Sequence, residues 1–123
     1  MKRFAPLAIA LLALACAREH APAPTRATAP AGDAAKGKEA ILKYGCTSCH
    51  VIPGIEGPRG MVGPALDHWT ARAVIGKSTP RTHENLVKWI RDPQSMDPEN
   101  TMPKLGVTEG DAHDIAAYLE TLK

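Results

Sequence analysis

The residues Cys46-Thr47-Ser48-Cys49-His50 decide the interpretation of this 123-residue chain. Two cysteines three positions apart, with a histidine directly after the second, are typical of the attachment site of a c-type haem. Each thiol adds to one vinyl group of the porphyrin, and the two vinyl groups require two sulfur atoms about one helical turn apart. The imidazole of His50 then ligates the iron. The motif therefore predicts one covalently bound haem c.

Other sites also use a CxxC pair. A structural zinc site needs four ligands, and the only other cysteine, Cys16, lies thirty residues before Cys46 without a second pair. A thioredoxin-like redox pair opens a helix after a strand, and no βαβ pattern precedes Cys46. A chance occurrence of the motif stays open from these five residues alone.

The N-terminal sequence predicts export. Lys2 and Arg3 form a positive segment, and residues 4–15 form an apolar stretch that is too short for an ordinary transmembrane span. We therefore expect residues 1–15 to be a signal peptide. Because haem is normally attached covalently outside the cytoplasm, both features point to the periplasm of a bacterium.

Residues 12–16 (LALAC) resemble a lipobox, with Ala15 before a cysteine that becomes the lipidated N-terminus. Lipidation explains an otherwise unpaired cysteine, and two acyl chains anchor stably where one does not. Ordinary cleavage after Ala15 or Ala17 stays open. Residues 16–31 are rich in Ala and Pro, cannot bury enough surface to fold alone, and are expected to be a tether.

Residues 32–123 are expected to form one small domain. It contains eleven Lys and Arg against twelve Asp and Glu, and it shows no basic stripe, so no nucleic-acid partner is expected. Its aromatic residues are Tyr44, Trp69, Trp89 and Tyr118. These are few aromatic residues for the core of such a domain, and a buried haem would complete that core.

Helical signals dominate, and the expected fold is all-α with about four helices around the haem. The first helix is capped by Asp33 and runs to about Tyr44, with Gly37 at a close crossing. A short helical turn is expected over residues 70–75. A third helix is capped by Thr82 and ends before Pro93. The last helix is capped by Thr108, with Asp111 in a capping box and one apolar face, made of Ile115, Tyr118, Leu119 and Leu122.

Met102 is the predicted second iron ligand. It lies in a loop between two helices and is stiffened by Pro103, and a soft thioether favours ferrous iron. Met96, six residues upstream, is the main competitor and is otherwise expected to pack at the haem pocket. Met61 is expected to pack nearby. His68 is a ligand candidate of a bis-histidine variant, whereas His83 and His113 are expected to be solvated.

His50 needs an acceptor for its second ring N–H, since backbone carbonyls commonly orient metal-ligating histidines. The rigid turn Gly63-Pro64-Ala65-Leu66 supplies a candidate, and we predict the carbonyl of Pro64 in this role. A simple loop proline is the alternative.

The complete set of motifs resembles a class I mono-haem cytochrome c. It comprises Gly37 and residues 46–50 (CTSCH), 63–66 (GPAL), 85–93 (NLVKWIRDP), 101–103 (TMP) and 114–119 (DIAAYL). The set is especially similar to the cytochrome c domain fused to subunit II of some bacterial haem-copper oxidases. Unlike those proteins, this chain shows no copper-binding domain before the motifs.

The resemblance implies the cytochrome c fold, ligation by His50 and Met102, and the crossing of the N- and C-terminal helices at Gly37 and Tyr118. It also implies that Trp89 and Arg72 line the haem pocket, with Arg72 near a propionate. The implied function is one-electron transfer in a respiratory chain by a carrier, not an enzyme. Its implied partners are a terminal oxidase, a dehydrogenase or another cytochrome, reached from a lipid anchor in the membrane.

Two other functions stay open at this point. One is a haem sensor or enzyme with a displaceable sixth ligand. The other is a lipoprotein without haem, whose CxxC pair is structural or thiol-reactive. An absorption spectrum distinguishes all three functions.

Overall fold

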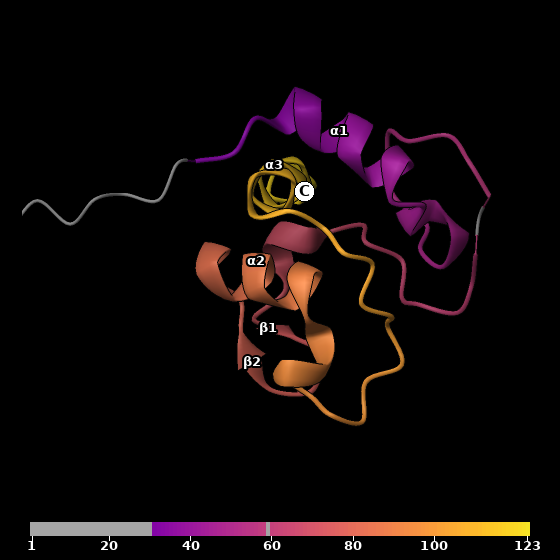
Figure 1. Ribbon diagram of the computed structural model, residues 1–123. Helices are drawn as coiled ribbons and strands as arrows, with labels where there is room; N and C mark the ends of the chain where they lie inside the picture. Colours follow the sequence, from indigo (N-terminus) through magenta and orange to yellow (C-terminus); the bar gives the residue numbers. More distant parts are fainter. Residues whose placement is uncertain (1–30, 59) are drawn as a thin grey trace, which may run out of the picture.

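The computed structural model describes residues 31–58 and 60–123, so the predicted signal peptide, Cys16 and the tether up to residue 30 lie outside the described residues. Figure 1 shows the chain arranged around helices α1 (Ala34–Lys43), α2 (His83–Arg91) and α3 (Glu109–Leu119). The connections contain the 3₁₀ helices η1 (Cys46–Ser48), η2 (Trp69–Ala71) and η3 (Pro93–Ser95) and the strands β1 (Val74–Ile75) and β2 (Thr79–Pro80).

Helix α1 begins and ends where the sequence predicts. The carboxylate of Asp33 accepts hydrogen bonds from the backbone N–H groups of Ala35 and Lys36, which otherwise have no partner within the helix. After the C-cap Tyr44, Gly45 adopts a left-handed conformation with φ of 68°, which ends the helix. The chain therefore enters η1 directly after α1, and this turn contains Cys46.

Helices α1 and α3 cross at Gly37, as the sequence predicts. A Cβ atom on Gly37 would lie 2.0 Å from the backbone oxygen of Asp114 and 3.0 Å from Cβ of Tyr118. Only glycine permits this approach. A hydrogen bond also joins the two helices at the outer end of this crossing, because the Asp33 N–H donates to Oδ1 of Asp114 at 2.7 Å.

The start of α3 corrects one detail of the expected capping box. Thr108 caps the helix, because its hydroxyl accepts from the Asp111 N–H at 3.2 Å. The Asp111 carboxylate does not return to the Thr108 N–H. It accepts instead from Tyr44 Oη at 2.7 Å and Lys43 Nζ at 2.9 Å. The side chain expected to complete the cap therefore joins α3 to α1.

The segment after residue 66 differs from the expected helical turn over residues 70–75. Helix η2 occupies only Trp69–Ala71, and β1 then pairs antiparallel with β2, with Val74 opposite Pro80 and Ile75 opposite Thr79. Gly76 turns the chain between the strands with φ of 57°, and the Trp89 ring packs against it. The described residues therefore contain three α-helices, not about four, together with one short hairpin.

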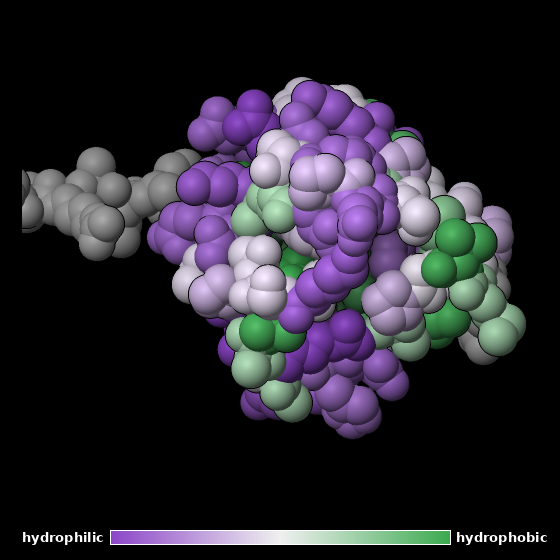
Figure 2. Space-filling view, turned by 90° about the horizontal axis from the view of Figure 1, so that it is seen from below, coloured by the Kyte–Doolittle hydropathy of each residue, from purple (hydrophilic) through white to green (hydrophobic). Residues whose placement is uncertain are grey.

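The core lies between the three helices and the hairpin. Thr82 caps α2 as predicted, and α2 contributes Leu86, Val87, Trp89 and Ile90 to the core. Figure 2 shows a mixed polar surface with apolar residues gathered toward one side and others visible in the hollow near its centre. No helix within the described ranges is long and apolar enough to cross a bilayer.

Candidate functional site

Helix η1 places the CxxCH motif on a single turn. The backbone N–H groups of Cys49 and His50 both donate to the carbonyl of Cys46, at 3.2 and 3.0 Å. This tight turn faces a cavity of about 460 Å³, whose wall includes Cys46, Cys49 and His50. The volume is in the range of cofactor and ligand pockets in proteins.

The remainder of the cavity wall is largely apolar and comes from every part of the domain. The described wall includes Ile41 of α1, Leu86 and Trp89 of α2, and Ile115 and Leu119 of α3. Met102 lies in the same wall, on the loop between η3 and α3. The structure thus gathers the two cysteines, His50 and Met102 around one cavity, as the sequence predicts.

His50 is oriented by the loop that follows it. Its Nδ1 lies 2.7 Å from the carbonyl oxygen of Pro64, and a carbonyl can only accept, so Nδ1 donates and Nε2 is left as the unprotonated nitrogen. Gly63 makes the contact possible, because a Cβ there would lie 2.3 Å from the His50 ring. The expected contact between His50 and Pro64 is present.

The other methionines lie elsewhere. Met96 packs against the hydrophobic core but is not among the residues of the cavity wall, which corrects the expectation that it packs at the pocket. Met61 is 92% exposed, so the expectation that it packs was wrong. Both residues lie in or next to irregular segments, where sequence periodicity gives no indication of burial.

Two histidines are more buried than the sequence predicts. His113 is only 9% exposed and His83 is half-buried, although both were expected to be solvated. His83 Nε2 lies 2.9 Å from His113 Nδ1, and His83 Nδ1 lies 3.1 Å from a Glu120 carboxylate oxygen. The histidines join α2 to α3 outside the cavity. His68 is exposed and occupies the position before η2 with a left-handed backbone and no capping hydrogen bond from its side chain.

Trp69 is the cavity residue that sequence reasoning missed. It is 4% exposed, and its indole Nε1 is buried without a hydrogen-bond partner. A buried N–H without an acceptor costs about 1–3 kcal/mol. The signal in the sequence was its place after the GPAL turn, but no pattern distinguished it from an ordinary core tryptophan.

Arg72 lies beside Trp69 on the cavity wall. Its guanidinium lies 5.5 Å from the centre of the Trp69 ring, and it donates to the carbonyl oxygens of Ala65 and Asp67. Its own carbonyl accepts from Nε of Arg81 at 2.6 Å. The guanidinium of Arg72 thus lies beside the indole ring of Trp69, and both residues line the cavity.

Cys46 and Cys49 are both half-buried, and neither forms a disulfide with another described cysteine. Burial raises the pKa of the Cys46 thiol above its usual range, so less of it is thiolate at neutral pH. Reactive cysteines have lowered pKa values. Cys46 therefore lacks the lowered pKa that is typical of reactive cysteines. Within residues 31–58 and 60–123, no three His, Cys, Asp or Glu side chains are grouped to hold a metal ion.

Comparison with known proteins agrees with this geometry. A family model for cytochrome c matches residues 34–123. The chain belongs to the cytochrome c family. Membership implies a covalently bound haem c and identifies electron transfer as the chemistry of this domain.

Curated relatives of this cytochrome include the cytochrome c oxidase subunit 2 proteins of three bacteria. That of Alkalihalophilus pseudofirmus is 35% identical over 89 residues, covering 72% of this chain and 25% of the relative. That of Bacillus sp. (strain PS3) is 32% identical over 93 residues, covering 72% and 26%. That of Bacillus subtilis is 29% identical over 104 residues, covering 80% and 29%. The cytochrome thus spans under a third of the length of these relatives.

Proposed function

We propose that this chain is a tethered electron carrier of the bacterial periplasm, with one haem c ligated by His50 and Met102. The observation on which the proposal rests is that Cys46, Cys49, His50 and Met102 line one largely apolar cavity. Two thiols one turn apart, an imidazole and a thioether form the donor set of a low-spin haem c site.

An observation that does not involve the CxxCH motif also supports a haem in this cavity. Trp69 lines the cavity close to Arg72, and its buried Nε1 has no acceptor among the described residues. A haem propionate provides the carboxylate oxygen that such a donor needs, and a nearby guanidinium favours its charge. The apolar remainder of the wall suits the porphyrin.

The protein's residues hold the haem and set its electronic properties. Cys46 and Cys49 would form its two thioether bonds, and His50 would ligate the iron through Nε2, since Nδ1 donates to Pro64. Met102, in the wall of the same cavity, would supply a thioether sulfur as the second ligand. The bound haem supplies reversible one-electron exchange at the iron. The apolar wall from α2 and α3 excludes water, and the sulfur ligand raises the reduction potential.

The absorption spectrum of the purified protein tests this proposal. We expect a low-spin c-type spectrum with a methionine-to-iron charge-transfer band. Met102→Ala should keep the covalent haem, lose that band, lower the reduction potential and bind cyanide. Met96→Ala is the control, because Met96 lies outside the cavity wall and should leave the band unchanged.

Other spectra would overturn the proposal in distinguishable ways. High-spin ferric haem in the unmodified protein would favour a sensor or enzyme with an open sixth position. The absence of haem absorption would indicate a lipoprotein without haem. If Met96→Ala loses the band and Met102→Ala retains it, the ligand assignment is wrong. A low-spin spectrum without the band in the unmodified protein would make a histidine such as His68 the candidate ligand.

The location and partners form the second half of the proposal. Residues 1–15 would direct export, Cys16 would be lipidated, and residues 16–31 would tether the domain to the membrane. The relatives are subunits of cytochrome c oxidases, which supports a terminal oxidase as one redox partner, with a dehydrogenase or another cytochrome as the second. Cys16→Ser should move the protein from the membrane to the soluble periplasmic fraction. Retention of Cys16→Ser in salt-washed membranes would contradict the anchor.

A further inference from the structure

We infer that Gln94 is the positioning residue that holds the Met102 loop closed over the haem cavity. The inference rests on the proposed ligation by Met102. It is drawn from the way in which a single amide side chain bridges two backbone carbonyls of this loop.

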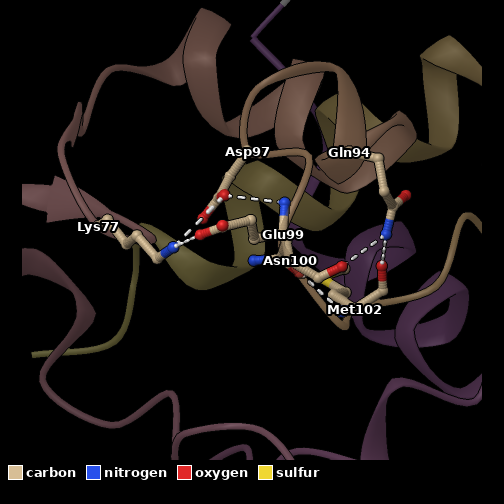
Figure 3. Close-up of polar contacts among 6 residues, drawn as sticks. All are labelled: Lys77, Gln94, Asp97, Glu99, Asn100 and Met102. Atoms are coloured by element: carbon tan, nitrogen blue, oxygen red, sulfur yellow. Dashed lines mark hydrogen bonds and ion pairs between the residues drawn. The ribbon is translucent and has the colours of Figure 1, made fainter.

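The Met102 loop has no regular secondary structure between η3 and α3. Its backbone polar groups therefore need partners from outside a helix or sheet. Gln94 lies in η3 and is half-buried, and its Nε2 donates to the carbonyl oxygens of Asn100 at 3.1 Å and Met102 at 2.5 Å (Figure 3). Because both partners are acceptors, the amide nitrogen is the end of the side chain that fits.

A second contact fixes the same residue through its preceding peptide group. The Met102 N–H donates to Oδ1 of Asn100 at 2.7 Å, which closes a local turn just before the methionine (Figure 3). The N–H and the carbonyl of Met102 are therefore both satisfied by side chains. This leaves the Met102 backbone with one orientation, which sets the direction from which its side chain enters the cavity.

The ionic contacts of the loop are weaker candidates for this role. Lys77 lies 2.6 Å from a Glu99 oxygen and 3.9 Å from an Asp97 oxygen, but the Lys77 side chain is 67% exposed (Figure 3). Lys104 pairs with Asp92 at 2.6 Å and is also exposed. Exposed ion pairs contribute about 0–1 kcal/mol and are screened by salt. The half-buried amide of Gln94 is therefore a stronger restraint on the Met102 loop than these ion pairs are.

The consequence for the site concerns exchange of the methionine ligand. An external ligand such as cyanide can reach the iron only while Met102 is displaced, so its apparent affinity is proportional to the population of that open state. Loss of the Gln94 hydrogen bonds leaves two loop carbonyls without their donor and favours the open state. Gln94 would thus determine how rarely the carrier is open to small ligands.

Cyanide titration of the ferric holoprotein tests this inference. Gln94→Met keeps the length of the side chain without its donor, and it should raise the apparent cyanide affinity by about tenfold to hundredfold. Gln94→Glu also lacks the N–H donor at neutral pH but is polar, and it should act in the same direction. Both variants should weaken the methionine-to-iron band and speed hydrogen exchange at the Met102 amide.

Two matched controls distinguish the amide from its surroundings. Ser95→Ala removes a hydrogen bond to the Asp92 carbonyl on the same 3₁₀ helix, and Lys77→Met removes the exposed ion pairs. Each should change cyanide affinity by less than about threefold.

The outcomes distinguish this inference from the proposed function. If the unmodified protein shows the band, but both Gln94 variants match the controls in cyanide affinity and amide exchange, the role of Gln94 is refuted and the carrier proposal stands. If one Gln94 variant fails to fold, the other decides. A protein without the band refutes the Met102 ligation and the inference with it.

Discussion

At the scale of single residues, the site depends on contacts so close that they leave no room for an additional side-chain atom. The His50 ring sits where a Cβ on residue 63 would lie, and its Nδ1 then meets the carbonyl of the next residue, Pro64. Two adjacent residues therefore fix both the position and the tautomer of the imidazole. An alanine at position 63 would move the ring and break this hydrogen bond.

Trp69 gives a prediction at this scale. Trp69→Phe keeps an aromatic ring but removes the N–H that we assign to a haem propionate. Because the N–H offsets negative charge near the iron, its loss should lower the midpoint potential by roughly 20–60 mV. Protein-film voltammetry measures this shift, and the pH dependence of the potential should change as well.

The control for this prediction is Trp89→Phe, since both tryptophans line the cavity and only Trp69 has a buried Nε1 without a partner. A smaller shift is expected for Trp89→Phe. Equal shifts in the two variants would show that aromatic packing, not the N–H, sets the potential.

Sequence reasoning predicted the residues of the candidate site where covalent spacing or local chain stiffness encodes them, and the structure places them around one cavity. Cys46, Cys49 and His50 follow from the spacing of the motif, and Met102 from its loop before a proline. The orphaned Nε1 of Trp69, the amide bridge of Gln94 and the burial of His113 could not be predicted. Each depends on which residues of distant segments meet, and no local pattern specifies that.

At the scale of elements, the contact between α1 and α3 organises the domain. It combines an apolar crossing at Gly37 with the polar cluster of Lys43, Tyr44 and Asp111. Since η1 follows α1 directly, the position of α1 against α3 also sets the position of the cysteines.

Gly37→Ala tests the crossing. Alanine favours a helix by about 1 kcal/mol, but its Cβ would overlap a backbone oxygen that cannot rotate away, and overpacking costs about 1–3 kcal/mol or more. We expect a net loss of about 2 kcal/mol in the free energy of unfolding, measured with urea.

Gly110→Ala in α3 is the matched control. Nothing lies within 4 Å of a Cβ there, so this variant should gain about 0.5–1 kcal/mol. A stabilised Gly37→Ala variant would show that the helices do not cross so closely.

The polar cluster predicts a pH dependence of stability. Hydrogen bonds from Tyr44 and then from Lys43 lower the pKa of Asp111, and the same contact with Asp111 raises the pKa of Lys43. A lowered carboxyl pKa stabilises the fold above the unfolded value of about 3.9, and this stability is lost as the pH falls through the folded value. A raised lysine pKa stabilises the fold below the ordinary lysine value, and this stability is lost as the pH rises through the folded value.

Asp111→Asn should therefore be less stable than the unmodified protein at neutral pH, and the difference should shrink below about pH 4. Thermal unfolding followed by circular dichroism across this range measures it. A constant difference between the two proteins would refute the assignment.

The elements were predictable where capping and periodicity coincide. Asp33, Thr82 and Thr108 cap the three α-helices as expected, because each side chain can serve its own helix without help from the tertiary structure. The hairpin was missed, since strands of two residues have no period. Asp111 was assigned to the wrong partner because residues at the end of α1, which is distant in sequence, compete with the helix cap for its carboxylate.

At the scale of the whole molecule, the domain is built around its cavity. All three α-helices contribute apolar side chains to the cavity wall. The whole domain contains only four residues of the types Phe, Trp and Tyr. Without the haem, these side chains lack the partner that would complete their packing. Covalent attachment is therefore expected to be a condition of stability as well as of electron transfer.

Replacing both cysteines tests this expectation. Cys46→Ala with Cys49→Ala should abolish covalent haem and give a protein that melts at a lower temperature and is degraded by protease. Haem staining of denaturing gels and limited proteolysis measure these effects. Ser48→Ala, an exposed position between the two cysteines, is the control and should behave as the unmodified protein does. A haem-free double variant that resists protease would contradict the prediction.

The crossing of α1 with α3 has a consequence for the order in which the chain folds. Asp33 and Asp114 are separated by 81 positions, so nearly the whole domain must be synthesised before Gly37 can meet its partner. Closing so long a loop is slow relative to local helix formation. Until α3 arrives, α1 lacks the helix that it packs against, and the cavity wall around Cys46 and Cys49 is incomplete. The topology thus keeps a time window in which haem can be attached before the core closes.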